Sequence, residues 1–188
     1  MAKALSDDYT EIVILCEDRQ QEVFIRRFLK KNGIKNRRVR VLPYPAGRGS
    51  GEQFVREQYQ FEVEEHRRRA AKLNIALIVM QDCDERSVEA ARARLEQTVN
   101  RHQNERIAIL LPKRNIETWI RFLMDGGPVD ESEHYPKLNR ESECHDVVDR
   151  LGEKNEYRLT PNVPSSLRAA CPEIRRILPA KRCVQSSQ

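Results

Sequence analysis

The sequence predicts an α/β fold of three layers, in which helices cover a mainly parallel central sheet of about four strands. Short apolar runs rich in β-branched residues alternate along the chain with longer segments whose apolar residues recur at helical spacing. One run, Ile75 to Met80, is continuously apolar, as expected of a central strand buried on both faces. Strands that alternate with helices favour a parallel sheet with right-handed crossovers.

The first predicted unit is a strand, a helix and a second strand. The run from Glu11 to Cys16 is apolar and β-branched, and it predicts the first strand. From Arg19 to Asn32 the apolar residues have helical spacing, and Gly33 is a typical stop signal. Arg38 to Leu42 then predicts the second strand, which completes a βαβ unit.

The middle of the chain continues the alternation. Glu52 to Lys72 predicts a long helix with a narrow apolar stripe, and the central strand from Ile75 to Met80 follows it. Ser87 to Gln103 predicts a charged helix with one buried side. Arg106 to Leu111 predicts the fourth strand, because it is a short apolar run that ends at a proline.

A last helix, from about Asn115 to the glycines at 126 and 127, closes the predicted core. We expect residues 1–127 to form this α/β core. Residues 128–188 are expected to form a helical and loop extension that packs on the core within the same domain. Its predicted elements are helices over Cys144 to Leu151 and Ser165 to Leu178 and a frayed end from Cys183 to Gln188.

Length and composition fit one domain of a cytoplasmic protein. A chain of 188 residues is long enough for one domain with a core. The 34 Lys+Arg residues outnumber 29 Asp+Glu residues, and a net charge of +5 permits a polyanionic partner without requiring one. Five cysteines, an odd number, and a start without an apolar signal core predict free thiols in the cytoplasm. We expect no membrane association, and no pattern indicates an oligomeric state.

Acidic residues follow two predicted strands. Asp82 and Asp84 come after the central strand, and Glu17 comes after the first. Because residues i and i+2 of an extended segment project to the same side, Asp82 and Asp84 are expected to point into one site. Carboxyl ends of parallel strands share an edge, so Glu17 is expected there too. Three carboxylates that hold Mg²⁺ or Mn²⁺ suit phosphoryl-transfer chemistry. The alternative is a solvated turn that caps the next helix.

Basic residues suggest a nucleic-acid partner. Lys113 and Arg114 lie in the turn after the fourth strand, at the acidic edge, and are candidates to contact a scissile phosphate. Arg48 lies in a glycine-rich loop before the long helix, and such a loop can hold phosphate on its backbone N–H groups. Arg67 and Arg68 belong to a basic run of that helix. We expect Arg48, Arg67, Arg68 and Arg114 to contact a nucleic-acid backbone, and Lys113 to act in catalysis.

The order of these motifs resembles the Toprim fold of topoisomerases, DnaG-type primases and OLD-family nucleases. The shared features are an apolar strand ending in glutamate, a helix, and a later apolar strand ending in DxD, all within Glu11 to Asp84. The segments PKRNIETWI and PSSLRAACPEIRRIL resemble small Toprim-related proteins of bacterial defence and mobile loci. The resemblance implies a divalent-metal-dependent nuclease, acting on DNA or RNA in phage defence or a mobile element.

The resemblance also implies roles for individual residues. Glu17 is expected as general acid/base, Asp82 and Asp84 as metal ligands, and Glu117 as a further acid of the site. Two positions depart from the family pattern. Asp18 stands where a glycine usually follows the first glutamate, and Gln21 stands where an acid is often found. Because of these departures, metal binding is better supported than turnover.

Two other function classes remain open. A phosphorylation receiver also has paired acids after its first strand, a later aspartate and a lysine at a strand end, which Glu17, Asp18, Asp82 and Lys113 loosely match. The first acid would be glutamate, however, and the long basic helix would have no counterpart. The other class is a non-catalytic interaction module that acts with an ATPase partner and uses these acids structurally.

Overall fold

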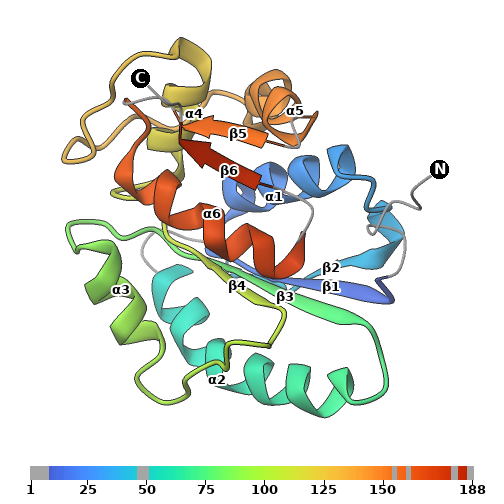
Figure 1. The fold of residues 1–188 in the computed structure, drawn as a ribbon. Coiled ribbons are helices and arrows are strands. Elements are labelled where there is room, and N and C mark those ends of the chain that lie inside the picture. Colours follow the sequence, from blue (N-terminus) through green and yellow to red (C-terminus); the bar gives the residue numbers. More distant parts are fainter. Residues whose placement is uncertain (1–8, 46–50, 154–155, 160–161, 179–181, 186–188) are drawn as a thin grey trace.

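A four-stranded parallel sheet lies at the centre of the protein (Figure 1). The computed structural model describes residues 9–45, 51–153, 156–159, 162–178 and 182–185. The strand order is β2-β1-β3-β4, and every neighbouring pair is parallel. The strands are β1 (Glu11–Leu15), β2 (Val39–Val41), β3 (Ile75–Met80) and β4 (Ile107–Leu110). The predicted α/β class with a parallel sheet of four strands is confirmed.

Helices cover both faces of the sheet (Figure 1). Successive strand residues point to opposite faces, so Ile12 and Ile14 enter one buried cluster while Val13 and Leu15 enter the other. The second cluster is covered by α2 (Gly51–Ala70) and α3 (Val88–Leu95). The first is covered by four helices: α1 (Arg19–Lys31), α4 (Ile116–Asp125), α5 (His145–Glu153) and α6 (Ser165–Ile177). The extension therefore shares a buried cluster with the core.

The helix after β3 is shorter than the sequence predicted. We expected it to reach Gln103, but α3 ends at Leu95. Beyond this end, Arg101 turns inward: its side chain is only 6% exposed and donates to the carboxylate of Glu96 at 3.0 Å and to the carbonyl of Ile107 at 2.9 Å.

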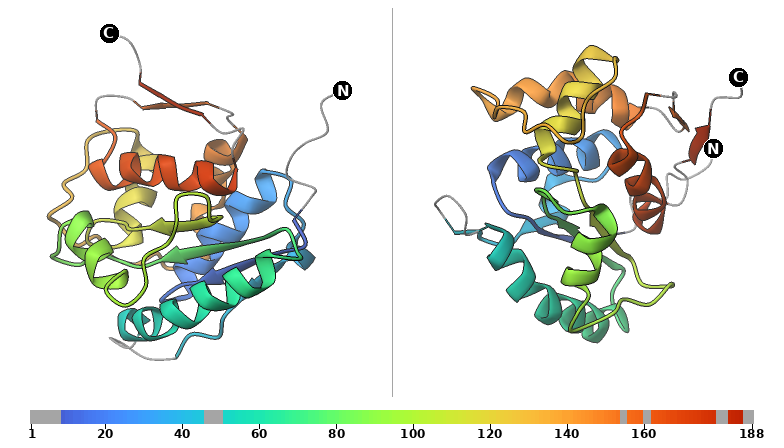
Figure 2. Two further views of the ribbon diagram at one scale, coloured as in Figure 1. Left: turned by 60° about the horizontal axis from the view of Figure 1, so that its bottom comes forward. Right: turned by 90° about the vertical axis from the view of Figure 1, so that its left-hand side faces the viewer.

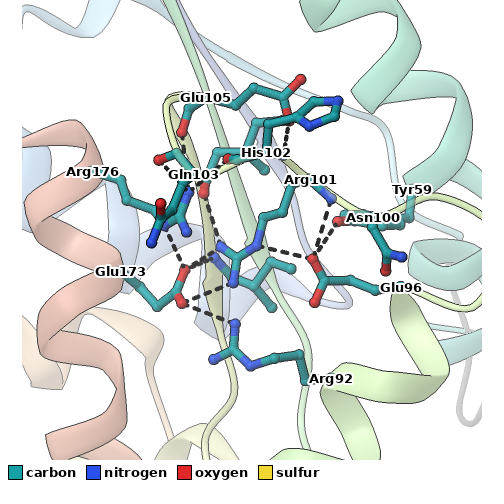
Figure 3. Close-up of polar contacts among 12 residues, drawn as sticks. Tyr59, Arg92, Glu96, Asn100, Arg101, His102, Gln103, Glu105, Glu173 and Arg176 are labelled. Carbon is teal, nitrogen blue, oxygen red and sulfur yellow. Dashed lines mark hydrogen bonds and ion pairs between the residues drawn. The ribbon is translucent and has the colours of Figure 1, made fainter.

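A buried carboxylate fastens α6 to the open edge of the sheet (Figure 3). Glu173 accepts hydrogen bonds from Arg92 at 2.9 Å, from Arg101 at 2.9 Å and from the backbone N–H of Ile109 at 3.0 Å. Ile109 belongs to the edge strand β4, whose outward donors would otherwise offer a pairing surface to another chain. The Glu173 cluster thus satisfies the backbone N–H of Ile109, and Arg101 the carbonyl of Ile107, on the outer side of this edge strand.

The C-terminal segment holds structure that the sequence did not predict. β5 (Glu156–Leu159) pairs in parallel with β6 (Arg182–Gln185), so the expectation of a frayed end from Cys183 is wrong for residues 183–185. Figure 2 shows this pair at the periphery, outside the helices. The sequence pattern of these two strands is weak because each has only four residues.

The cysteines also depart from expectation. Cys16, Cys83 and Cys144 are free and buried, whereas Cys171 is disulfide-bonded. The prediction of free thiols throughout is therefore wrong for Cys171. Cys83 lies between the two aspartates, but its thiol points into the fold, 3.6 Å from the carbonyl of Leu111.

Within the described ranges, no helix has the length and apolar character needed to cross a membrane.

Candidate functional site

Glu17 and Asp82 follow β1 and β3 and meet at the carboxyl edge of the sheet. This edge of the sheet is on the left in Figure 1 and faces the viewer in the right-hand view of Figure 2. The backbone N–H of Asp82 donates to Oε1 of Glu17 at 3.0 Å. Gln21, buried in the first turn of α1, donates from Nε2 to Oδ1 of Asp82 at 2.9 Å. Its Oε1 accepts from the N–H of Glu17 at 3.0 Å. One glutamine thus holds both acidic residues in place.

Both carboxyl groups of this pair retain protons more strongly than usual. Burial raises the pKa of Glu17 to about 8, and the negative charge of Asp84 adds to the effect, although the hydrogen bond from Asp82 works against it. Burial also raises the pKa of Asp82 well above its ordinary value, and the charge of Glu17 contributes next. Repulsion between two negative charges in a poorly hydrated place is reduced when one carboxylate takes up a proton or when a cation binds between them.

Glu117 adds a third carboxyl group nearby. It lies in the first turn of α4, it is 3% exposed, and its Oε1 has no hydrogen-bond partner among the described residues. Burial raises its pKa, and the negative charge of Asp18 adds to the effect. Its own charge contributes to the raised pKa of Asp82, so the two carboxyl groups lie within electrostatic reach of each other. The structure therefore brings Glu17, Asp82 and Glu117 into one region.

Asp84 lies within electrostatic reach of Glu17, but its side chain faces solvent. Its backbone has a φ of 51° and forms an isolated bridge with Arg114, so residues 82–84 are not extended and the expected same-side projection fails. The side chain of Asp84 is 61% exposed, and its nearest cation is Nη1 of Arg86 at 4.0 Å. In the described part of the chain, no group of three His, Cys, Asp or Glu residues is arranged to hold a metal ion.

The donors that are present nevertheless fit Mg²⁺ or Mn²⁺. Mg²⁺ is commonly bound through one or two carboxylates while water or substrate phosphate fills its other positions. Glu17 and Asp82 supply two such groups, and burial together with the charge of neighbouring carboxylates raises the pKa of each. The buried, unpartnered Oε1 of Glu117 is a further acceptor. Glu17 and Asp82 are the residues that would hold the ion.

Gly51, the first residue of α2, brings the helix against Glu17. A Cβ at this position would lie 2.7 Å from the Cβ of Glu17 and 2.8 Å from its carbonyl oxygen. Real Cβ atoms do not approach that closely, so only glycine permits this contact. The sequence showed a glycine-rich loop here, but the close approach to Glu17 is visible only in three dimensions.

Lys113 and Arg114, the two cations predicted in the β4–α4 turn, contact the loop after β3. Lys113 donates to the carbonyl of Glu85 at 3.3 Å and also to that of Arg86. Arg114, with a φ of 63°, lies 3.4 Å from the carboxylate of Glu85 through Nη1. Both residues lie at the acidic edge, but Lys113 serves the loop after β3 and does not contact the acids.

Lys137 is the cation that sequence reasoning missed. It comes from the polar segment after α4, and its Nζ lies 2.8 Å from Oδ2 of Asp18. Asp18 raises the pKa of Lys137, and the charges of Glu117 and Asp82 add to the effect. The segment around Lys137 has no periodicity, so the sequence gives no signal that it folds back onto the site.

The predicted nucleic-acid contacts on α2 lie at the opposite edge of the sheet. The helix begins beside Glu17 and ends beside Glu11, where Arg69 donates to that carboxylate at 2.6 Å. Twenty helical residues span about 30 Å. There Arg67 pairs with Glu105, and Arg68 pairs with a glutamate one turn earlier in its own helix. The structure does not bring Arg67 and Arg68 to the acids, and Arg48 lies outside the described residues.

Comparisons of the chain with protein-family models, curated proteins and solved structures found no match.

Proposed function

We propose that this protein is a divalent-metal-dependent nuclease of the Toprim type, which hydrolyses phosphodiester bonds of DNA or RNA. The observation that carries the proposal is the contact between Glu17 and Asp82 at the ends of adjacent strands, together with their raised pKa values. The carboxyl edge of an open α/β sheet is where such folds bind their ligands. We place this activity in the bacterial cytoplasm, in phage defence or a mobile element.

Each acidic residue has a defined part in this proposal. Glu17 and Asp82 would hold Mg²⁺ or Mn²⁺, and the chemistry supplied there would be neutralisation of the phosphate charge and activation of water. Glu117, whose Oε1 is unpartnered among the described residues, would accept the proton of an attacking water. Asp84 lies close enough for its charge to raise the pKa of Glu17. Its negative charge would therefore attract a cation to the site without binding it directly.

A second candidate is a non-catalytic module that acts with an ATPase partner. The outward position of Asp84 and the glutamine at 21 favour it, because a catalytic site of this family would be expected to gather more acids. The receiver-like alternative gains no support. It assigns Lys113 to the acidic site, whereas Lys113 donates to backbone carbonyls of the loop after β3.

A cleavage assay separates the first two candidates. Purified protein is incubated with single-stranded DNA, duplex DNA and RNA at low salt, with Mg²⁺, Mn²⁺ or EDTA. Cleavage should require the metal and should disappear in Asp82→Asn, which keeps the acceptor that Gln21 needs. The matched control is Glu89→Gln, which removes an exposed carboxylate of α3 and should leave cleavage unchanged.

Three outcomes of this assay are informative. Metal-dependent cleavage that Asp82→Asn abolishes supports the nuclease. Cleavage that survives in Asp82→Asn would mean a contaminating nuclease or a different site. Binding without cleavage in every metal would favour the interaction module.

A further inference from the structure

We infer that the segment of residues 134–141 forms one wall of the acidic site, and that the ammonium of Lys137 contacts a phosphate of the nucleic acid there. The inference rests on the proposed nuclease function and names its substrate-positioning element. It assigns to the extension after α4 the role that the sequence suggested for the arginines of α2.

Hydrogen bonds anchor this segment to the core on both sides of Lys137. On one side, Nδ2 of Asn115 donates to the carbonyl of Tyr135 at 2.7 Å. On the other side, Nε2 of Gln20 donates to the carbonyl of Glu141 at 3.3 Å. Asn115 and Gln20 are each 4% exposed, so the wall is attached through side chains that are themselves fixed in the core. These two hydrogen bonds keep the segment that carries Lys137 at the acidic edge of the sheet.

Lys137 is also available to a substrate. Its side chain is 69% exposed, although its Nζ contacts Oδ2 of Asp18. Asp18 does not depend on that contact, because its Oδ1 accepts the N–H of Gln21 at 3.1 Å and caps α1. When a phosphate arrives, the ammonium can therefore exchange partners while Asp18 keeps its helix cap.

Other cations at this edge have partners too, but they are less exposed: Arg86 is 33% and Arg114 is 21% exposed, against 69% for Lys137. Lys113 donates to backbone carbonyls, Arg114 pairs with Glu85, and Arg86 lies 3.7 Å from Glu52. A strongly acidic site repels a polyanion unless a cation lies beside it. Lys137 lies beside Asp18, next in sequence to Glu17, and meets that need.

The test measures binding of a fluorescent oligonucleotide in EDTA over a series of salt concentrations. Wild-type protein is compared with Lys137→Ala, Lys137→Arg and Lys72→Ala, the last an exposed lysine at the opposite edge. Lys137→Ala should weaken binding about tenfold at low salt and reduce the salt slope by about one, because one phosphate contact is lost. Lys137→Arg should restore most of the affinity, and Lys72→Ala should match the wild type.

Asp18→Asn distinguishes a phosphate contact from a structural ion pair. If Lys137 only holds the wall through Asp18, removal of either charge should weaken binding alike. If Lys137 contacts phosphate, Asp18→Asn should bind as tightly as the wild type or more tightly, because a competing anion is gone while asparagine still caps α1.

Failure of this inference is separable from failure of the proposed function. If wild-type protein binds and cuts nucleic acid but Lys137→Ala behaves like Lys72→Ala, the wall inference is wrong and the nuclease proposal stands. If wild-type protein neither binds nor cuts, both are wrong.

Discussion

Gln21 donates a 2.9 Å hydrogen bond from Nε2 to Oδ1 of Asp82, across the ends of two adjacent strands. The amide is neutral and supplies a donor, where a carboxylate at the same place would supply another negative charge. The glutamine thus moderates the repulsion between Asp82 and Glu17 when no cation is bound.

We predict that Gln21→Glu destabilises the protein in EDTA and tightens its affinity for Mn²⁺. The new carboxylate faces that of Asp82 and replaces its hydrogen-bond donor, so melting in EDTA should occur several degrees lower. Saturating Mn²⁺ should recover most of this loss. Gln103→Glu, at an exposed position, is the control and should melt like the wild type. Equal melting of Gln21→Glu and wild type in EDTA would contradict the repulsion.

Stability without metal should depend on pH through Glu17. Its pKa in the folded protein is raised from 4.5 to about 8, so the folded state binds the proton more tightly than the unfolded state. This contribution is fully present below pH 4.5 and is lost as pH rises through about 8. Glu17→Gln keeps an acceptor for Asp82 and cannot ionise. Its urea midpoint should therefore fall less than that of the wild type between about pH 5 and about pH 8. Parallel curves for the two proteins would mean that Glu17 has an ordinary pKa.

Gly51→Ala should disturb the site through its backbone. The added methyl group would meet Cβ and the carbonyl oxygen of Glu17 at less than 3 Å, so α2 must shift away from the end of β1. We expect a loss of about 1–3 kcal/mol in the free energy of unfolding, as for other overpacked positions. Gly127→Ala is the control, because nothing lies within 4 Å of its new Cβ. Similar urea midpoints for the two variants would contradict the contact.

Glu173→Gln should be among the most damaging single changes on α6. It removes one of the two counter-charges of the Arg101 guanidinium, whose side chain is 6% exposed, and leaves only Glu96. Removal of one partner of a buried ion pair typically costs about 3–5 kcal/mol. Glu65→Gln breaks the ion pair with Arg68 on the surface of α2 and should have no measurable effect on the urea midpoint. Equal effects of the two variants would show that the Glu173 cluster contributes little.

The sheet could be predicted from the sequence because its strands are short, apolar and separated by clear helical patterns. Each predicted strand agrees with its observed bounds to within about one residue at either end. The inward turn of Arg101 beyond α3 was not predicted, because its partner Glu173 is 72 residues later in the chain. A contact of that kind has no local pattern.

The site was predicted in part. Glu17 and Asp82 meet because carboxyl ends of parallel strands share an edge, which follows from the topology alone. The exposure of the Asp84 side chain was not predicted, because extended backbone was expected beyond Met80, whereas Asp84 has a φ of 51°. Lys137 was missed because it reaches Asp18 from 119 positions away, within a polar loop that has no periodicity.

The most direct test is the position of Mn²⁺ in crystals of the protein soaked with that ion, found by its anomalous scattering. The proposed site predicts a peak within coordination distance of carboxylate oxygens of both Glu17 and Asp82, about 2.0–2.6 Å away as for hard divalent cations. The peak should be absent from Asp82→Asn crystals and present in those of Glu89→Gln. No peak at saturating Mn²⁺, or a peak that touches neither Glu17 nor Asp82, would contradict a metal-dependent nuclease site at this edge of the sheet.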